Sequence, residues 1–143
     1  MPRKIPPPPA PDSLEAWFAL RNPELKIASF QRILMLELEK LALRETKHRR
    51  LLVMMPPGHG KTSLGTFTFA PWYMSRFPTH NVMVLSYDDK LGKRFGRALR
   101  NACRKAALDE GYEGLHPRSD AHAAGFRTQR EATKACTSTA VCQ

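Results

Sequence analysis

The stretch Met54-Met55-Pro56-Pro57-Gly58-His59-Gly60-Lys61-Thr62 predicts a phosphate-binding loop. An apolar run leads into it, and a segment with helical character follows it. Glycines let the backbone N–H groups of such a loop approach a phosphate, and the helix that follows adds its positive N-terminal end. The Lys61 ammonium is expected to reach the β- and γ-phosphates, and the Thr62 hydroxyl to ligate Mg²⁺. We therefore predict an ATP and Mg²⁺ site at Gly58, His59, Gly60, Lys61 and Thr62.

This stretch departs from the common pattern G-x-x-x-x-G-K-[ST] at its first position. Residue 55, where the first glycine is expected, is Met, and Gly58 lies inside the loop instead. An ordinary glycine-rich turn before a helix is the alternative interpretation. The apolar run before the loop and the helical pattern after it favour the nucleotide site.

The composition sets limits on the rest of the molecule. A length of 143 residues suits one domain with a modest core. The chain has no apolar run of about 18 residues and no apolar signal segment after its basic start, so we expect neither a membrane span nor secretion. The cysteines Cys103, Cys136 and Cys142 show no zinc spacing and no even-numbered disulfide framework, which indicates a reduced cytoplasm. A net charge of +10 suits a polyanionic partner.

We expect three parts in the chain: a proline-rich flexible leader at residues 1–11, a partial P-loop ATPase domain at 12–118, and a disordered or out-of-frame tail at 119–143. Near the start of the domain, Asp12 and Glu15 resemble the capping pair of a short helix. A second helix is predicted from about residue 29 by an apolar stripe of Phe30, Leu34, Leu38 and Leu41.

Residues 50–107 show an alternation of apolar and amphipathic segments. The predicted order is a strand at 50–55, a helix at 62–76 that is kinked at Pro71, a strand at 81–87, and a helix from Asp88 or Asp89 to about Leu108. Continuous apolar strands are typical of a parallel sheet covered on both faces, and the alternation favours right-handed crossovers. We therefore predict an α/β fold, an incomplete P-loop NTPase parallel sheet with flanking helices and a disordered tail.

The last of these helices carries a basic stripe. Its members recur at i, i+4, i+7 and i+11 and are Lys93, Arg97, Arg100 and Arg104. No acidic residue interrupts residues 90–105, so these like charges repel one another unless an anion neutralises them. Phosphates would do so, and we take the four residues as the candidate DNA-binding site. A solvated helix face is the alternative.

Several further motifs accompany the loop. In chain order they are Pro56-Pro57-Gly58-His59-Gly60-Lys61-Thr62, Ala70-Pro71-Trp72-Tyr73, Leu85-Ser86-Tyr87, Arg94-Phe95-Gly96-Arg97 and Arg100-Asn101. Together they resemble the N-terminal ATPase domain of tailed-phage terminase large subunits, the motors that package viral DNA into a procapsid. The resemblance covers about residues 25–107. The loop alone is shared by many NTPases, whereas the ordered combination is much more specific.

The resemblance implies ATP and Mg²⁺ as cofactors and ATP-driven DNA translocation as the activity of the parent protein. It implies double-stranded DNA, a portal protein and a small terminase subunit as partners, in the cytoplasm of a bacterial host. It also implies that Gln31, which matches a glutamine ahead of the loop in that family, contacts adenine. A polar surface residue of an amphipathic helix is the alternative for Gln31.

ATP hydrolysis by this class requires an acidic pair after a later strand, to hold Mg²⁺ and to activate water. Asp88 and Asp89 superficially fit, but an Asp at the end of a strand is more often a helix N-cap. The sequence contains no recognisable later apolar strand and no nuclease domain. Catalytic residues are therefore left unassigned, and enzymatic turnover stays an open question.

Residues 119–143 contain few large apolar side chains, too few to offset their ordering entropy. The family resemblance stops near Gln129, which indicates a truncated, frame-disrupted product; a genuine disordered tail is the alternative. The sequence thus predicts a fragment of a terminase large subunit that binds ATP and hydrolyses it little. The alternatives are a non-enzymatic basic DNA-binding remnant or functionless prophage relic, and a helicase-like P-loop ATPase outside packaging.

Overall fold

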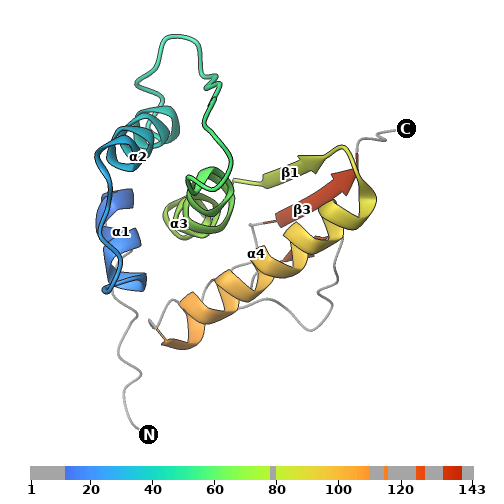
Figure 1. Cartoon of the computed structure of the whole chain (residues 1–143). Helices are drawn as coiled ribbons and strands as arrows, with labels where there is room; N and C mark the ends of the chain where they lie inside the picture. The colour runs from blue at the N-terminus through green and yellow to red at the C-terminus, as the bar shows by residue number, and fades with distance from the viewer. Residues whose placement is uncertain (1–11, 78–79, 110–114, 116–124, 128–133, 140–143) are drawn as a thin grey trace, which may run out of the picture.

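The computed structural model describes residues 12–77, 80–109, 115, 125–127 and 134–139. The elements are α1 (Leu14–Arg21), α2 (Ser29–Ala42), a π-helix η1 (Ser63–Thr68), α3 (Phe69–Arg76), β1 (Val82–Ser86), α4 (Asp89–Asp109), β2 (Gly125–Arg127) and β3 (Lys134–Thr139). Figure 1 shows α1 and α2 on one side of the molecule, α3 in the middle, and the strands with α4 on the other side. The predicted flexible leader lies outside the described residues.

The two N-terminal helices begin where capping groups are available. Ser13 Oγ accepts a hydrogen bond from the N–H of Ala16 at 3.0 Å, so Ser13 rather than Asp12 caps α1. The Asp12 carboxylate instead forms an ion pair with the end of α3. At the start of α2, Gln31 Oε1 accepts from the N–H of Ala28 at 3.0 Å, which satisfies one of the unpaired donors of the first turn.

A widened helical turn separates the phosphate loop from α3. Thr68 Oγ1 donates to the carbonyl of Ser63 at 2.9 Å, and the N–H of Phe69 bonds to the carbonyl of Leu64, both five residues back. Pro71 lies in the first turn of α3, just after this π-helical segment. The single kinked helix predicted here therefore consists of two pieces, and the irregularity lies immediately before the proline.

The core is formed by side chains that α1, α2, η1, α3 and α4 bury between them. The largest fully buried side chains are Trp17, Trp72, Leu14, Met35, Leu64, Met74, Leu99, Pro71 and Cys103. In the stripe predicted on α2, Leu34 and Leu38 are buried, whereas Phe30 is 43% exposed. Burial also raises the pKa of the Cys103 thiol to about 12. Among the described residues the helices thus supply most of the buried core, against which Val82 and Val84 of the strand at 82–86 also pack.

The predicted P-loop NTPase parallel sheet is wrong for this chain. The described residues are mostly helical, and residues 50–55, predicted as a central strand, form no strand. Leu52 and Met54 are each 85% exposed, while Val53 and Met55 pack against the core. An apolar run that was expected to be buried on both faces is therefore covered on one face, and no strand pairs with it among the described residues.

The strand β1 instead belongs to a small sheet of order β1-β3-β2. β1 pairs in parallel with β3, with Val84 opposite Thr137, and β3 pairs antiparallel with β2. Both β2 and β3 lie within residues 119–143, the tail that the sequence predicts to be disordered or out of frame. The rest of that tail lies outside the described residues. On β1, Met83 and Leu85 are each 60% exposed, so its second face is open.

Candidate nucleotide-binding site

The loop between the extended segment 51–56 and the first helical turn bends at two glycines. Gly58 has a φ of 81° and Gly60 a φ of 82°, in the left-handed region that residues with a Cβ rarely adopt. The N–H of Leu64 then bonds to the carbonyl of Gly60 at 2.8 Å and closes the first turn of the helix. Left-handed residues in a tight loop point successive backbone N–H groups to one side, as in anion-binding nests.

A cavity of ≈ 310 Å³ lies against this loop. It is lined by Pro56, Pro57, Gly58, Gly60, Lys61, Thr62 and Ser63. Lys61 is exposed and Thr62 half-buried, at the point where the helix begins. An ammonium group, a hydroxyl and the positive end of a helix therefore border one cavity, an arrangement that suits a polyphosphate.

Gln31 on α2 lies beside this loop. A Cβ at Gly60 would be 3.3 Å from Gln31 Nε2, so the helix and the loop approach each other closely. Next to them, the rings of Phe30 and His59 have centroids 5.6 Å apart at an angle of 59°. The structure thus places the predicted adenine contact next to the predicted phosphate loop.

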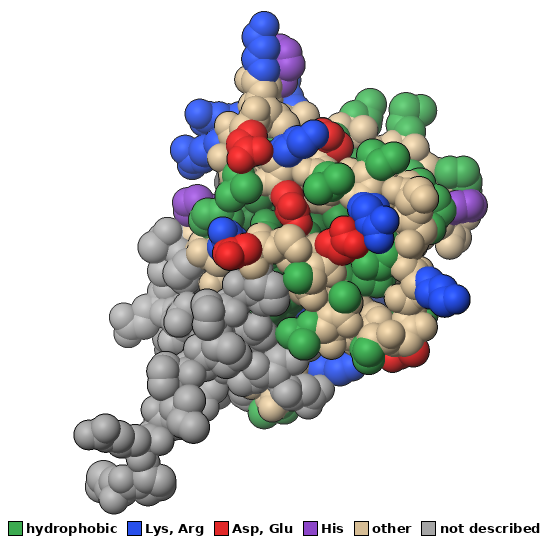
Figure 2. All heavy atoms as spheres, turned by 90° about the vertical axis from the view of Figure 1, so that its left-hand side faces the viewer, with side chains coloured by type: hydrophobic (Ala, Val, Ile, Leu, Met, Phe, Trp, Pro, Cys, Tyr) green, Lys and Arg blue, Asp and Glu red, His purple; other side chains and the backbone are tan. Residues whose placement is uncertain are grey.

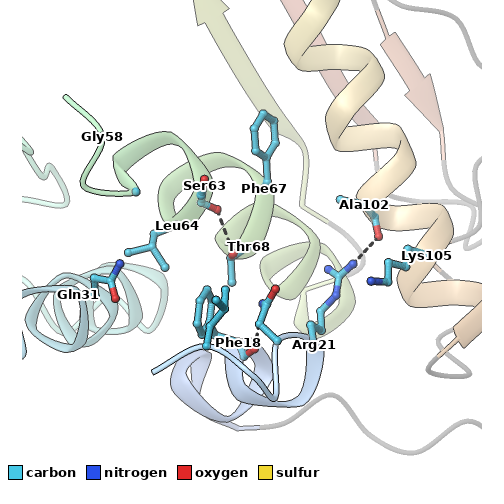
Figure 3. Close-up of a pocket in the computed structure, with 13 residues that line it drawn as sticks. Phe18, Arg21, Gln31, Gly58, Ser63, Leu64, Phe67, Thr68, Ala102 and Lys105 are labelled. Carbon is cyan, nitrogen blue, oxygen red and sulfur yellow. Dashed lines mark hydrogen bonds between the residues drawn. The ribbon is translucent and has the colours of Figure 1, made fainter. Parts of the chain in front are cut away.

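A second cavity of ≈ 470 Å³ adjoins the loop and shares Gly58, Gly60 and Ser63 with the first. Figure 3 shows Phe18 and Arg21 beside it from α1, Gln31 from α2 and Lys105 from α4. Its other lining residues are Asn22, Leu25, Leu64, Phe67, Thr68 and Ala102. Arg21 donates to the carbonyl of Ala102 at 3.0 Å, which ties α1 to α4 at the wall of this cavity.

Sequence reasoning missed Phe18, Arg21 and Lys105 as neighbours of the loop. They come from helices far apart in the sequence, and no local motif signals that α1 and α4 meet beside the glycines. No Asp or Glu is found among the described lining residues of either cavity. Both cavities are therefore positive in character and favour an anionic ligand.

The two acidic residues after β1 are used at the start of α4. Asp88 Oδ2 accepts a hydrogen bond from the N–H of Leu91 at 3.2 Å, so Asp88 caps the helix, the interpretation that the sequence favours. Asp89 Oδ2 lies 2.6 Å from the ammonium of Lys93, one helical turn later. Within the described part of the chain, His, Cys, Asp and Glu form no group of three or more that could hold a metal ion.

The four predicted DNA-binding residues differ in their availability. Arg97 and Arg104 are exposed, whereas Arg100 is half-buried. Lys93 is exposed but forms the ion pair with Asp89. The stripe therefore has two exposed arginines and two side chains with other contacts. In the parts of the chain that the structure describes, no helix combines the length and the apolar character needed to cross a membrane.

No protein-family model, no curated protein and no solved structure matches this chain. The resemblance to terminase large subunits thus stays a prediction from the motifs. The features that bear on nucleotide binding lie in the loop itself. At Gly58 and Gly60 a side chain would strain the backbone, and at Gly60 it would also approach Gln31. Glycines with a positive φ are typical of loops whose backbone N–H groups bind phosphate.

Proposed function

We propose that the loop of residues 56–62 binds the phosphates of ATP together with Mg²⁺. The observation that carries the proposal is the pair of left-handed glycines, Gly58 and Gly60, directly before a helix that begins with Lys61 and Thr62. Such a backbone presents N–H groups to an anion at little strain, because neither position has a Cβ. The proposal depends on this local geometry and not on the P-loop NTPase sheet.

Each residue has a role in this proposal. The backbone N–H groups around Gly58 and Gly60 hold phosphate oxygens, and Lys61 offers its charge to the β- and γ-phosphates. The Thr62 hydroxyl ligates Mg²⁺, which when bound would offset the charge of the phosphate oxygens. Gln31, beside Gly60, is positioned to hydrogen-bond the edge of the adenine. Binding without appreciable turnover is expected, since Asp88 and Asp89 serve the start of α4.

In its wider role, the chain is proposed to be an ATP-binding part of a phage terminase large subunit in the cytoplasm of a bacterial host. Support comes from the ordered motifs that resemble that family, and from the exposed cations Arg97 and Arg104 on α4. Double-stranded DNA is the proposed partner at this helix, and the portal protein and small terminase subunit follow from the resemblance.

Calorimetric titration with Mg·ATP tests the nucleotide site. Loss of a charge-assisted contact typically costs about 1.5–3 kcal/mol, so Lys61→Ala should weaken binding on the order of tenfold to a hundredfold. Lys26→Ala is the matched control, because Lys26 is also an exposed lysine but lies outside both cavities. Equal affinity of the wild type and Lys61→Ala for Mg·ATP would show that the loop is not part of the ATP site.

A further inference from the structure

The connection between α2 and the extended segment before the phosphate loop is strongly basic. It spans residues 44–50 and is called the basic loop below. Its cationic side chains are Arg44, Lys47, Arg49 and Arg50. All four are exposed, and among the described residues none of them forms an ion pair. Glu45 is the one acidic residue of the basic loop.

Figure 1 shows the basic loop at the upper end of the molecule, beyond α2. At the same end in Figure 2, a basic side chain and a histidine form the topmost projection, and further Lys and Arg side chains lie just below it, with acidic side chains at their level. The basic loop is thus a projecting patch of positive charge. It lies away from α4, which carries the other basic surface.

Two of these arginines adopt backbone conformations that favour glycine. Arg44 has a φ of 61° and Arg49 a φ of 47°. Arg44 ends α2 in a Schellman motif, in which its N–H bonds to the carbonyl of Leu41 at 3.2 Å and the N–H of Glu45 to that of Lys40 at 2.9 Å. Glycine is the preferred residue at this position. Arginine at two left-handed positions therefore indicates a use for the side chains.

Stabilisation of α2 explains only part of this charge. Cations near the C-terminal end of a helix offset the helix dipole, and Arg44 directly follows α2. The effect falls off within the last turn of the helix, so it does not account for Lys47, Arg49 and Arg50. Their charges repel one another at close range unless an anion lies between them.

We propose that the basic loop binds the phosphate backbone of double-stranded DNA, as a second surface separate from α4. The proposal rests on double-stranded DNA being the partner in the proposed function, and it assigns the duplex a second contact surface. Three of the four cations are arginines, whose planar guanidinium groups match phosphate oxygens through paired hydrogen bonds. No apolar side chain interrupts residues 44–50, and the exposed Leu43 and Leu52 lie outside them.

Binding of a fluorescently labelled duplex of about 20–30 base pairs to the full chain tests this proposal, between about 50 and 200 mM salt. The test variant is the double substitution Lys47→Gln/Arg50→Gln, which leaves the left-handed residues Arg44 and Arg49 in place. The slope of log affinity against log salt is negative, and each lost phosphate contact reduces its magnitude by about 0.9, so a fall in magnitude of roughly 1.8 is expected. Lys47→Ala/Arg50→Ala should give the same fall.

The control is Lys26→Gln/Arg32→Gln, which removes the same charge from exposed positions near the other end of α2, where Arg32 also loses its ion pair with Glu15 at 3.0 Å. Its salt slope should stay that of the wild type. An unchanged slope in Lys47→Gln/Arg50→Gln would overturn the proposal, and so would equal falls in both double variants. Weaker binding to anionic phospholipid vesicles with an unchanged DNA slope would assign the basic loop to lipid instead. If the salt slope changes only in variants of α4, DNA is still the partner but the basic loop does not contact it.

Discussion

Gln31 and Gly60 lie so close together that a Cβ at Gly60 would be 3.3 Å from Gln31 Nε2. The amide of Gln31 is held in turn, because its Oε1 accepts the N–H of Ala28 at 3.0 Å. The start of α2 therefore forms one wall against the phosphate loop. The left-handed φ of 82° favours glycine at residue 60, and any larger residue would also displace the end of the Gln31 side chain.

Gly60→Ala is expected to destabilise the fold and to weaken Mg·ATP binding. The left-handed backbone costs about 1–2 kcal/mol once a Cβ is present, and the contact with Gln31 adds to this. If the loop relaxes to avoid the strain, its N–H groups no longer point at the phosphates. Urea denaturation and calorimetric titration measure the two effects.

Gly65→Ala is the matched control for this substitution. Gly65 lies in η1, has no left-handed φ, and a Cβ there would meet nothing within 4 Å. Alanine in a helical segment should be neutral or stabilising by up to about 1 kcal/mol, with ATP binding retained. If Gly60→Ala behaved like Gly65→Ala, the loop geometry would be irrelevant to both stability and binding.

The helices were predictable because their signals are local. The apolar stripe of α2 buries Leu34 and Leu38, and Asp88 caps α4 through a hydrogen bond to a residue three positions on. The turn at Gly58 and Gly60 was predictable for the same reason, since glycine is the residue that tolerates a positive φ.

The sheet was not predictable, because strand pairing depends on distant partners. The apolar run 51–55 has the composition of a central strand, yet it forms no regular secondary structure and pairs with no strand among the described residues. β1 pairs instead with β3, whose sequence Lys134–Thr139 is rich in small and polar residues and has no strong strand signal. The second cavity escaped prediction likewise, since Arg21 and Lys105 meet beside the loop only through tertiary packing.

Asp88→Ala should lower the free energy of unfolding by about 1 kcal/mol, because the first turn of α4 loses its cap. The affinity for Mg·ATP should be unchanged. Asp88→Asn is the control, since Asn also caps helices well and should keep the stability. Urea denaturation and calorimetry on both variants separate the two roles of the residue. Loss of ATP affinity in Asp88→Asn at full stability would instead make Asp88 a Mg²⁺ ligand.

Stability should fall at high pH because of the buried thiol of Cys103. Its pKa rises from 9.0 to about 12 in the folded chain, since burial disfavours the thiolate. The folded state therefore holds this proton more tightly, an advantage fully present below about pH 9 and lost as the pH rises toward 12. Urea denaturation at about pH 8 and pH 10 should show a loss on the order of 1 kcal/mol larger in the wild type than in Cys103→Ala. The same pH dependence in both proteins would contradict this assignment.

DNA binding at α4 should depend mainly on the two exposed arginines of the stripe. Arg97→Gln/Arg104→Gln should reduce the magnitude of the negative slope of log affinity against log salt by roughly 1.8, at about 0.9 for each phosphate contact. Lys93→Gln/Arg100→Gln removes the same charge but should reduce this magnitude less, because Lys93 is paired with Asp89 at 2.6 Å and Arg100 is half-buried. Fluorescence anisotropy with a labelled duplex measures both slopes. A larger change in Lys93→Gln/Arg100→Gln would show that the Lys93–Asp89 ion pair breaks when DNA binds. Unchanged slopes in both double variants would show that DNA does not contact α4.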